Sequence, residues 1–124
     1  MPNTLLARDP APGSIVVVDW RDNHIAPEPG KRRPAVVISN PAALAGLRVL
    51  TVVPLTGQAQ AALPALSIRL EPSPKNGLIK PCFALAWNIQ TIAFERISEI
   101  TAATITSDEV SALKRLLFEY LNLD

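Results

Sequence analysis

The fold is decided by residues 14–20, which read SIVVVDW. This run of β-branched side chains is typical of a buried strand. A second such run, PAVVIS, spans residues 34–39 and begins with proline, which a strand tolerates best at its first position. The polar loop between them contains Pro27, Pro29 and Gly30, which interrupt a sheet ladder. The two runs therefore predict two strands joined by a polar loop.

Further strand patterns follow at intervals marked by turn residues. They span residues 47–54, 65–71, 82–87 and 97–105, and a turn or short helical segment is expected at 40–46. Within the second of these runs, Leu66, Ile68 and Leu70 alternate with polar side chains, as in a half-exposed strand.

The C-terminus carries the one clear helix pattern. Thr106 and Glu109 have the spacing of a capping box. Apolar side chains then recur at helical spacing on one face, namely Val110, Leu113, Leu116, Leu117, Tyr120 and Leu121. We therefore expect a mainly β protein with a C-terminal helix, built as a small, strongly bent sheet or open barrel.

Length and composition narrow the class of protein. The 124 residues suit one domain. With 48% hydrophobic residues and a net charge of only +1, the chain is too apolar and too weakly charged to be disordered. We expect residues 1–12 to be a flexible leader and residues 13–124 to form the domain. No apolar stretch approaches the roughly 18 residues of a membrane span, and the first residues lack the pattern of a signal peptide. A cytoplasmic protein without membrane association is the expectation.

The charges are segregated along the chain. Residues 31–80 hold seven basic side chains and one acidic, whereas residues 1–30 and 81–124 are each net acidic. Lys31, Arg32 and Arg33 lie together where the loop meets the second strand. Three cations at such a junction could bind phosphate. A solvated charge run is the competing interpretation, and the residues alone leave the choice open.

The usual catalytic arrangements are absent from the sequence. His24 is the only histidine, so a relay of two histidines within one chain is impossible, and its polar loop favours an exposed imidazole without a role. Cys82, the only cysteine, opens an apolar strand and is expected to be a core residue. No zinc motif, glycine-rich phosphate loop or nucleophile elbow is present. We expect no metal and no cofactor.

Several segments together resemble the MazF/PemK family of toxins from bacterial type II toxin–antitoxin pairs. The resemblance covers residues 13–123 and is carried by GSIVVVDW at 13–20, RPAVVIS at 33–39, VVPLTGQ at 52–58, GLIKP at 77–81 and IQTI at 89–92. It implies an SH3-like small barrel that forms a homodimer.

The resemblance also implies an activity. Family members are metal-independent endoribonucleases that cut single-stranded RNA, and a cognate antitoxin protein inhibits them. The catalytic pair of the family falls on Arg33 and Thr56, and its loop glutamate falls on Glu28. The remaining candidates would bind substrate: Lys31, Arg32, Gln58, Asn88 and Gln90.

Two features of the chain bear on base recognition. Trp20 and Trp87 could stack on bases, but each closes an apolar run, which favours packing in a core or dimer interface. Many family members carry an Asp-Gln pair followed by a basic residue where this chain reads WNIQ at 87–90. That departure weakens the expectation of base recognition in the usual manner.

Two alternatives come from other functional classes. One is a non-catalytic toxin related to the gyrase poison CcdB, which relies on a tryptophan near its C-terminus; this chain has none after Trp87. The other is a degenerate member of the fold that only binds RNA, against which the retained Arg33 and Thr56 argue.

Overall fold

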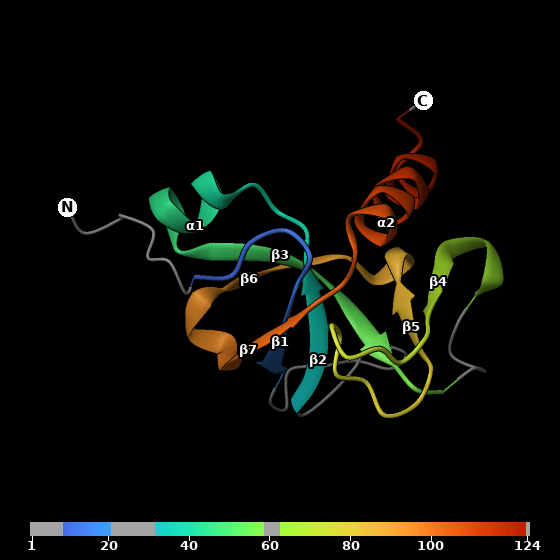
Figure 1. Cartoon of the computed structure of the whole chain (residues 1–124). Helices are drawn as coiled ribbons and strands as arrows, with labels where there is room; N and C mark the ends of the chain where they lie inside the picture. The colour runs from blue at the N-terminus through green and yellow to red at the C-terminus, as the bar shows by residue number, and fades with distance from the viewer. Residues whose placement is uncertain (1–8, 21–31, 59–62, 124) are drawn as a thin grey trace.

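The computed structural model describes residues 9–20, 32–58 and 63–123. In these ranges the chain forms a seven-stranded sheet and two α-helices (Figure 1). The strands are β1 (Ser14–Asp19), β2 (Arg32–Val37), β3 (Val49–Thr56), β4 (Ser67–Leu70), β5 (Cys82–Leu85), β6 (Gln90–Ala93) and β7 (Ile97–Thr104). The helices are α1 (Pro41–Leu47) and α2 (Ser107–Tyr120), with short 3₁₀ turns η2 (Pro64–Leu66), η3 (Ala86–Asn88) and η4 (Phe94–Arg96).

All strand pairs are antiparallel. The order across the sheet is β4-β5-β3-β2-β1-β7, and β6 pairs with β3 beside this path. The expected mainly β fold with a C-terminal helix is thus confirmed. The described strands curve like a small barrel without closing, since β4 and β7 remain the two ends of the path.

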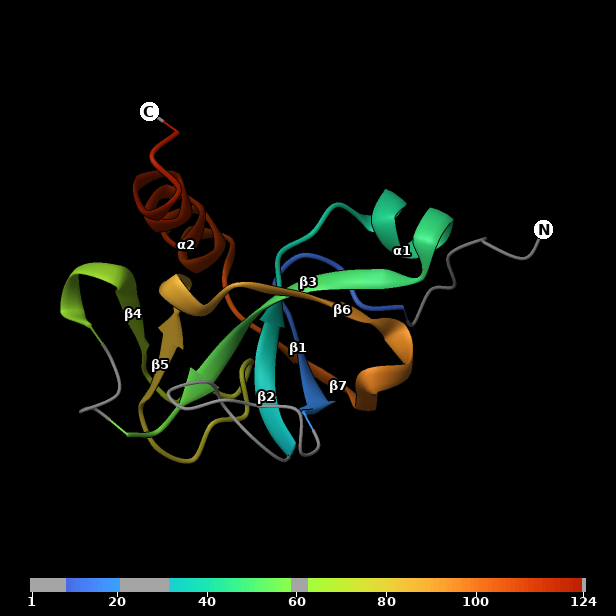
Figure 2. The same ribbon diagram turned by 180° about the vertical axis from the view of Figure 1, so that it is seen from behind.

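Strand β3 bends the sheet because it changes partners along its length. Its first half pairs with β6, from Val49 opposite Ala93 to Val52 opposite Gln90. Its last two residues pair with β5 instead, and Thr56 lies opposite Phe83. Figure 2 shows β3 running from β6 at one end to β5 at the other.

The sheet buries an apolar cluster on each face. The first cluster lies between the sheet and α2, and includes Ile15, Val36, Val53, Leu55 and Leu113. The second lies on the opposite face, and its buried members are Val16, Val18, Trp20, Ala35, Val37, Leu44, Leu50, Val52 and Ile92. Alternate residues of β1, β2 and β3 supply the two clusters, as the period of a strand requires.

Both helices are capped by side chains. Oδ1 of Asn40 accepts the N–H of Ala42 at 2.8 Å and starts α1, so the segment after the second strand is helical. At the start of α2, Oγ1 of Thr106 accepts the N–H of Glu109, and the Glu109 carboxylate accepts the N–H of Thr106. The expected capping box is confirmed. No helix of the described ranges is long and apolar enough to cross a membrane.

Several boundaries differ from the sequence prediction. Strand β2 begins at Arg32 rather than Pro34, because Asp19 of β1 pairs with Arg32. Strand β3 extends to Thr56, because β5 pairs with its end. The run predicted as a strand to residue 87 ends at Leu85, and residues 90–93 form a strand that was not predicted.

Candidate functional site

Arg33 and Thr56 occupy corresponding places on neighbouring strands. The pairs between β2 and β3 run from Val37 opposite Val52 to Ala35 opposite Pro54. Arg33 lies two residues before Ala35, and Thr56 lies two residues after Pro54. Because the strands are antiparallel, both residues lie beyond the same end of this ladder.

The two residues also belong to the same face of the sheet. Side chains two apart on a strand share a face, so Arg33 lies on the face of Ala35 and Val37, and Thr56 on that of Val52. These are members of the second apolar cluster. Beyond the end of the β2–β3 ladder, this face carries the exposed guanidinium of Arg33 and the half-buried hydroxyl of Thr56. Together these groups can donate hydrogen bonds to an anion.

Arg32 lies on the opposite face from Arg33. Arg32 pairs with Asp19 of β1, and on β2 it lies on the same face as Pro34 and Val36. Arg32 and Arg33, although adjacent in the sequence, are therefore not one cluster in the structure. Lys31, Glu28 and His24 lie outside the described residues.

A short turn follows Thr56. The backbone N–H of Gln58 donates to Oγ1 of Thr56 at 3.1 Å, and the Gln58 side chain is exposed. Gly57, between them, contacts a residue that the sequence did not single out. A Cβ at Gly57 would lie 2.6 Å from Cε of Lys80 and 3.0 Å from Nζ. The end of the Lys80 side chain therefore lies over the turn next to Thr56.

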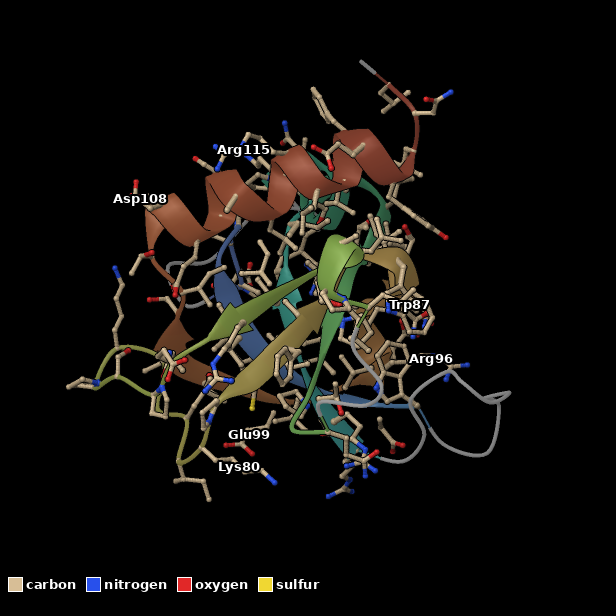
Figure 3. The ribbon with its side chains drawn as sticks, turned by 90° about the vertical axis from the view of Figure 1, so that its right-hand side faces the viewer. Lys80, Trp87, Arg96, Glu99, Asp108 and Arg115 are labelled. Atoms are coloured by element: carbon tan, nitrogen blue, oxygen red, sulfur yellow. The ribbon has the colours of Figure 1, made fainter. Side chains whose placement is uncertain are left out.

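Lys80 is visible in Figure 3 at the lower edge of the molecule, at the end of the segment that leads into β5. Lys80 belongs to the GLIKP motif, but no sequence pattern relates residue 80 to residue 57. Only the pairing of β5 with the end of β3 brings them together.

The two amide candidates bind each other. Nε2 of Gln90 donates to Oδ1 of Asn88 at 2.9 Å. Asn88 is only 7% exposed, and its Nδ2 has no hydrogen-bond partner among the described residues. Asn88 is therefore placed to hold Gln90, while Gln90, which is half-buried, remains the amide that a ligand can reach.

A polar hollow of about 240 Å³ adjoins Gln90. It is lined by Trp20, Gln90, Thr91, Ile92, Ala93 and Arg96. Trp20 is 5% exposed and belongs to the second cluster, which confirms its expected core packing. Gln90 lies opposite Val52, so the register places it on the face of Arg33 and Thr56.

The other face carries a larger, mostly apolar hollow of about 500 Å³. Ile15, Val17 and Pro34 line it together with residues 74–78 and 101–103. It contains neither Arg33 nor Thr56, so the candidate site lies across the sheet from it.

Cys82 is a core residue, as expected. It is buried beside Lys80, and its thiol donates to the Lys80 carbonyl oxygen at 3.6 Å. Burial raises the pKa of the Cys82 thiol, and the positive charge of Lys80 opposes that effect. Among the described residues no group of three or more His, Cys, Asp or Glu side chains could hold a metal ion.

A family model matches most of the chain. The model described as a PemK-like, MazF-like toxin of type II toxin-antitoxin systems matches residues 11–121. No curated protein matches the chain.

Solved structures share the fold. MazF of Deinococcus radiodurans superimposes with a TM-score of 0.77 at 21% identity, covering 92% of this chain and 97% of that one. The Mycobacterium tuberculosis toxin MazF-mt6 gives a TM-score of 0.69 at 22% identity, covering 90% and 98%. An endoribonuclease in complex with its cognate antitoxin, from a mycobacterial species, gives 0.69 at 18% identity, covering 94% and 98%. At these identities the likeness shows the fold.

Proposed function

Since the chain belongs to the family of PemK-like, MazF-like toxins of type II toxin–antitoxin systems, we propose that it is an endoribonuclease that cuts single-stranded RNA. The observation that carries the proposal is the placement of Arg33 and Thr56 on one face, beyond the same end of the β2–β3 ladder. A relative of the same fold is itself an endoribonuclease.

The proposed chemistry needs few protein groups because RNA supplies its own nucleophile. The 2′-hydroxyl next to the scissile phosphate loses its proton and attacks phosphorus, the bond to the 5′-oxygen breaks, and that oxygen takes a proton from water. The products are a 2′,3′-cyclic phosphate and a 5′-hydroxyl. The protein has to hold the strand in line for this attack, and orientation of that kind can lower a barrier by about 7–11 kcal/mol. The reaction therefore requires no metal ion.

Arg33 and Thr56 would stabilise the charge that develops on the phosphate. The guanidinium offers a planar, permanently charged fork of donors to the phosphorane oxygens. The Thr56 hydroxyl accepts from Gln58, so its own proton is directed to another acceptor, which we assign to a phosphate oxygen. Glu28 would act as the base that takes the 2′-proton.

Substrate binding would extend along the same face. We propose that Gln90, with the hollow beside it, contacts a base, and that Asn88 holds the Gln90 amide in position. Gln58 and Lys31 would contact the strand near the cleaved bond. Arg32, on the other face, would add only long-range attraction. Single strands are selected because a duplex hides the base edges and prevents in-line attack.

Two protein partners are part of the proposal. Among the solved relatives, MazF of Deinococcus radiodurans occurs in MazE–MazF complexes and the mycobacterial endoribonuclease is bound to its cognate antitoxin. We propose that a cognate antitoxin binds this chain, and that the chain forms a homodimer. Sedimentation at micromolar concentration should give about twice the chain mass of 13.4 kDa.

The test is cleavage of a long single-stranded RNA of varied sequence in the presence of EDTA. We expect discrete fragments with 5′-hydroxyl and 2′,3′-cyclic phosphate ends, mapped by sequencing of the ends. A folded, dimeric protein that binds the RNA without cutting it would contradict the proposal and favour a non-catalytic member of the fold.

A further inference from the structure

The contact between Lys80 and Gly57 lies directly beside the proposed catalytic pair. Gly57 follows Thr56, the last residue of β3, and the methylene and ammonium groups at the end of Lys80 lie where a Cβ of residue 57 would project. A side chain at position 57 would occupy the place of the Lys80 terminus. The lysine is exposed, so its ammonium is open to solvent and to a ligand.

Gly57 is not required by the backbone at this turn. The glycines with positive φ in the described residues are Gly13 and Gly77, so residue 57 has a conformation that other residues adopt. The three atoms nearest to an added Cβ all belong to the Lys80 side chain. What the glycine provides here is room for the lysine.

The Lys80 charge is not neutralised within the described structure. Lys80 forms no ion pair with the described residues, whereas Arg69 pairs with Glu71. Its positive charge also acts on the neighbouring thiol of Cys82. An exposed ammonium that has no acidic partner among the described residues, held beside Thr56, is suited to bind an anion.

We propose that Lys80, seated over Gly57, binds a second phosphodiester of the RNA strand, adjacent to the one that Arg33 and Thr56 hold. The inference rests on the proposed function and names a further subsite of that site. A lysine contacts phosphate as a point charge and reads no base. The subsite therefore holds the strand next to the catalytic pair without adding sequence preference.

The experiment measures binding of a mixed-sequence single-stranded RNA whose 2′-hydroxyls are all methylated, which prevents cleavage. The full chain is titrated by fluorescence anisotropy over about 50 to 200 mM KCl. For Lys80→Ala we expect about three- to fivefold weaker binding and a salt dependence shallower by about 0.7, the value of one phosphate contact on a single strand. Lys75→Ala, which removes an equal charge from the same loop, should leave the slope unchanged.

Gly57→Ala supplies a second, independent test, because it moves the lysine and keeps its charge. We expect this variant to weaken binding in the original chain and to have no further effect in the Lys80→Ala background. An equal loss in both backgrounds would mean that the substitution acts through the turn itself, and would overturn the inference. So would equal salt slopes for Lys80→Ala and Lys75→Ala.

These outcomes are distinct from failure of the proposed function. If the unaltered chain neither binds the methylated RNA nor cuts ordinary RNA, the proposed function is wrong and the subsite is excluded with it. If the chain binds and cuts RNA while Lys80→Ala keeps the original salt slope, only the subsite is excluded.

Discussion

The N–H of Gln58 donates a hydrogen bond to Oγ1 of Thr56, with 3.1 Å between the two atoms. The bond closes a small turn at the end of β3, in the manner of turns in which a hydroxyl accepts from the chain two residues on. A hydroxyl oxygen that accepts in this way keeps its proton for another partner. On the face that Thr56 shares with Arg33, this partner would be a phosphate oxygen.

Thr56→Val removes the hydroxyl and nearly preserves the shape of the side chain. We expect RNA cleavage to fall by about ten- to hundredfold, the value of a hydrogen bond to a charged group. Thr56→Ser keeps the hydroxyl and should retain most of the activity. Initial cleavage rates decide the matter, with circular dichroism to verify the fold. Equal rates for the valine and serine variants would exclude the hydroxyl from the mechanism.

Arg33→Ala should lower the cleavage rate by about 10²–10³-fold, as expected on removing a donor that stabilises the transition state. Because Arg33 is exposed, the thermal unfolding temperature should hardly change. Arg33→Lys keeps the charge without the planar fork and should recover only a small part of the rate. Arg32→Ala is the matched control, since its side chain lies on the other face. An Arg32 variant as impaired as the Arg33 variant would contradict this assignment.

Local sequence patterns predicted the elements whose signals are local. The β-branched run predicts β1 and the capping box at Thr106 predicts the start of α2, each from adjacent residues alone, and the structure contains both. Strand β6 was missed because its four residues include a single buried side chain, Ile92. Its strand conformation comes from pairing with β3, which lies far away in the sequence.

The site could be predicted in part. The family motifs point to Arg33 and Thr56, but that the two share a face follows only from the register of β2 and β3. The split of Arg32 from Arg33 has the same origin, because a strand beginning before Pro34 sends adjacent residues to opposite faces. The GLIKP motif contains Lys80, but no motif relates it to residue 57, because only the pairing of β5 with β3 brings the two together.

Asn88→Leu tests whether the buried Asn88 amide positions Gln90 rather than stabilising the fold. The buried Nδ2 of Asn88 lacks a partner among the described residues, so an apolar side chain of similar size should leave the unfolding temperature unchanged or slightly raised. Gln90 then loses its acceptor, and we expect the sequence preference at mapped cleavage sites to broaden. A large loss of stability with unchanged preference would contradict this role.

Leu113→Ala tests the packing of α2 on the sheet. Leu113 is 1% exposed in the first cluster, and truncation of such a leucine costs about 2–5 kcal/mol of unfolding free energy. Lys114→Ala, at the next and exposed position, should change it by less than about 0.5 kcal/mol. Urea unfolding monitored by circular dichroism gives both values, and equal losses would show that the helix does not pack as described.

Alkylation of Cys82 reports the position of the Lys80 charge without any RNA. Burial raises the pKa of this thiol, so little reactive thiolate is present near neutral pH, and we expect slow alkylation by iodoacetamide that accelerates as the pH rises. Lys80 acts in the opposite direction and lowers that pKa. Lys80→Ala should therefore raise it further and move the pH–rate profile to higher pH, whereas Lys75→Ala should not. A profile that does not move in Lys80→Ala would mean that the ammonium lies too far from Cys82 to act on its thiol, and the intact mass of the protein after timed alkylation distinguishes the two results.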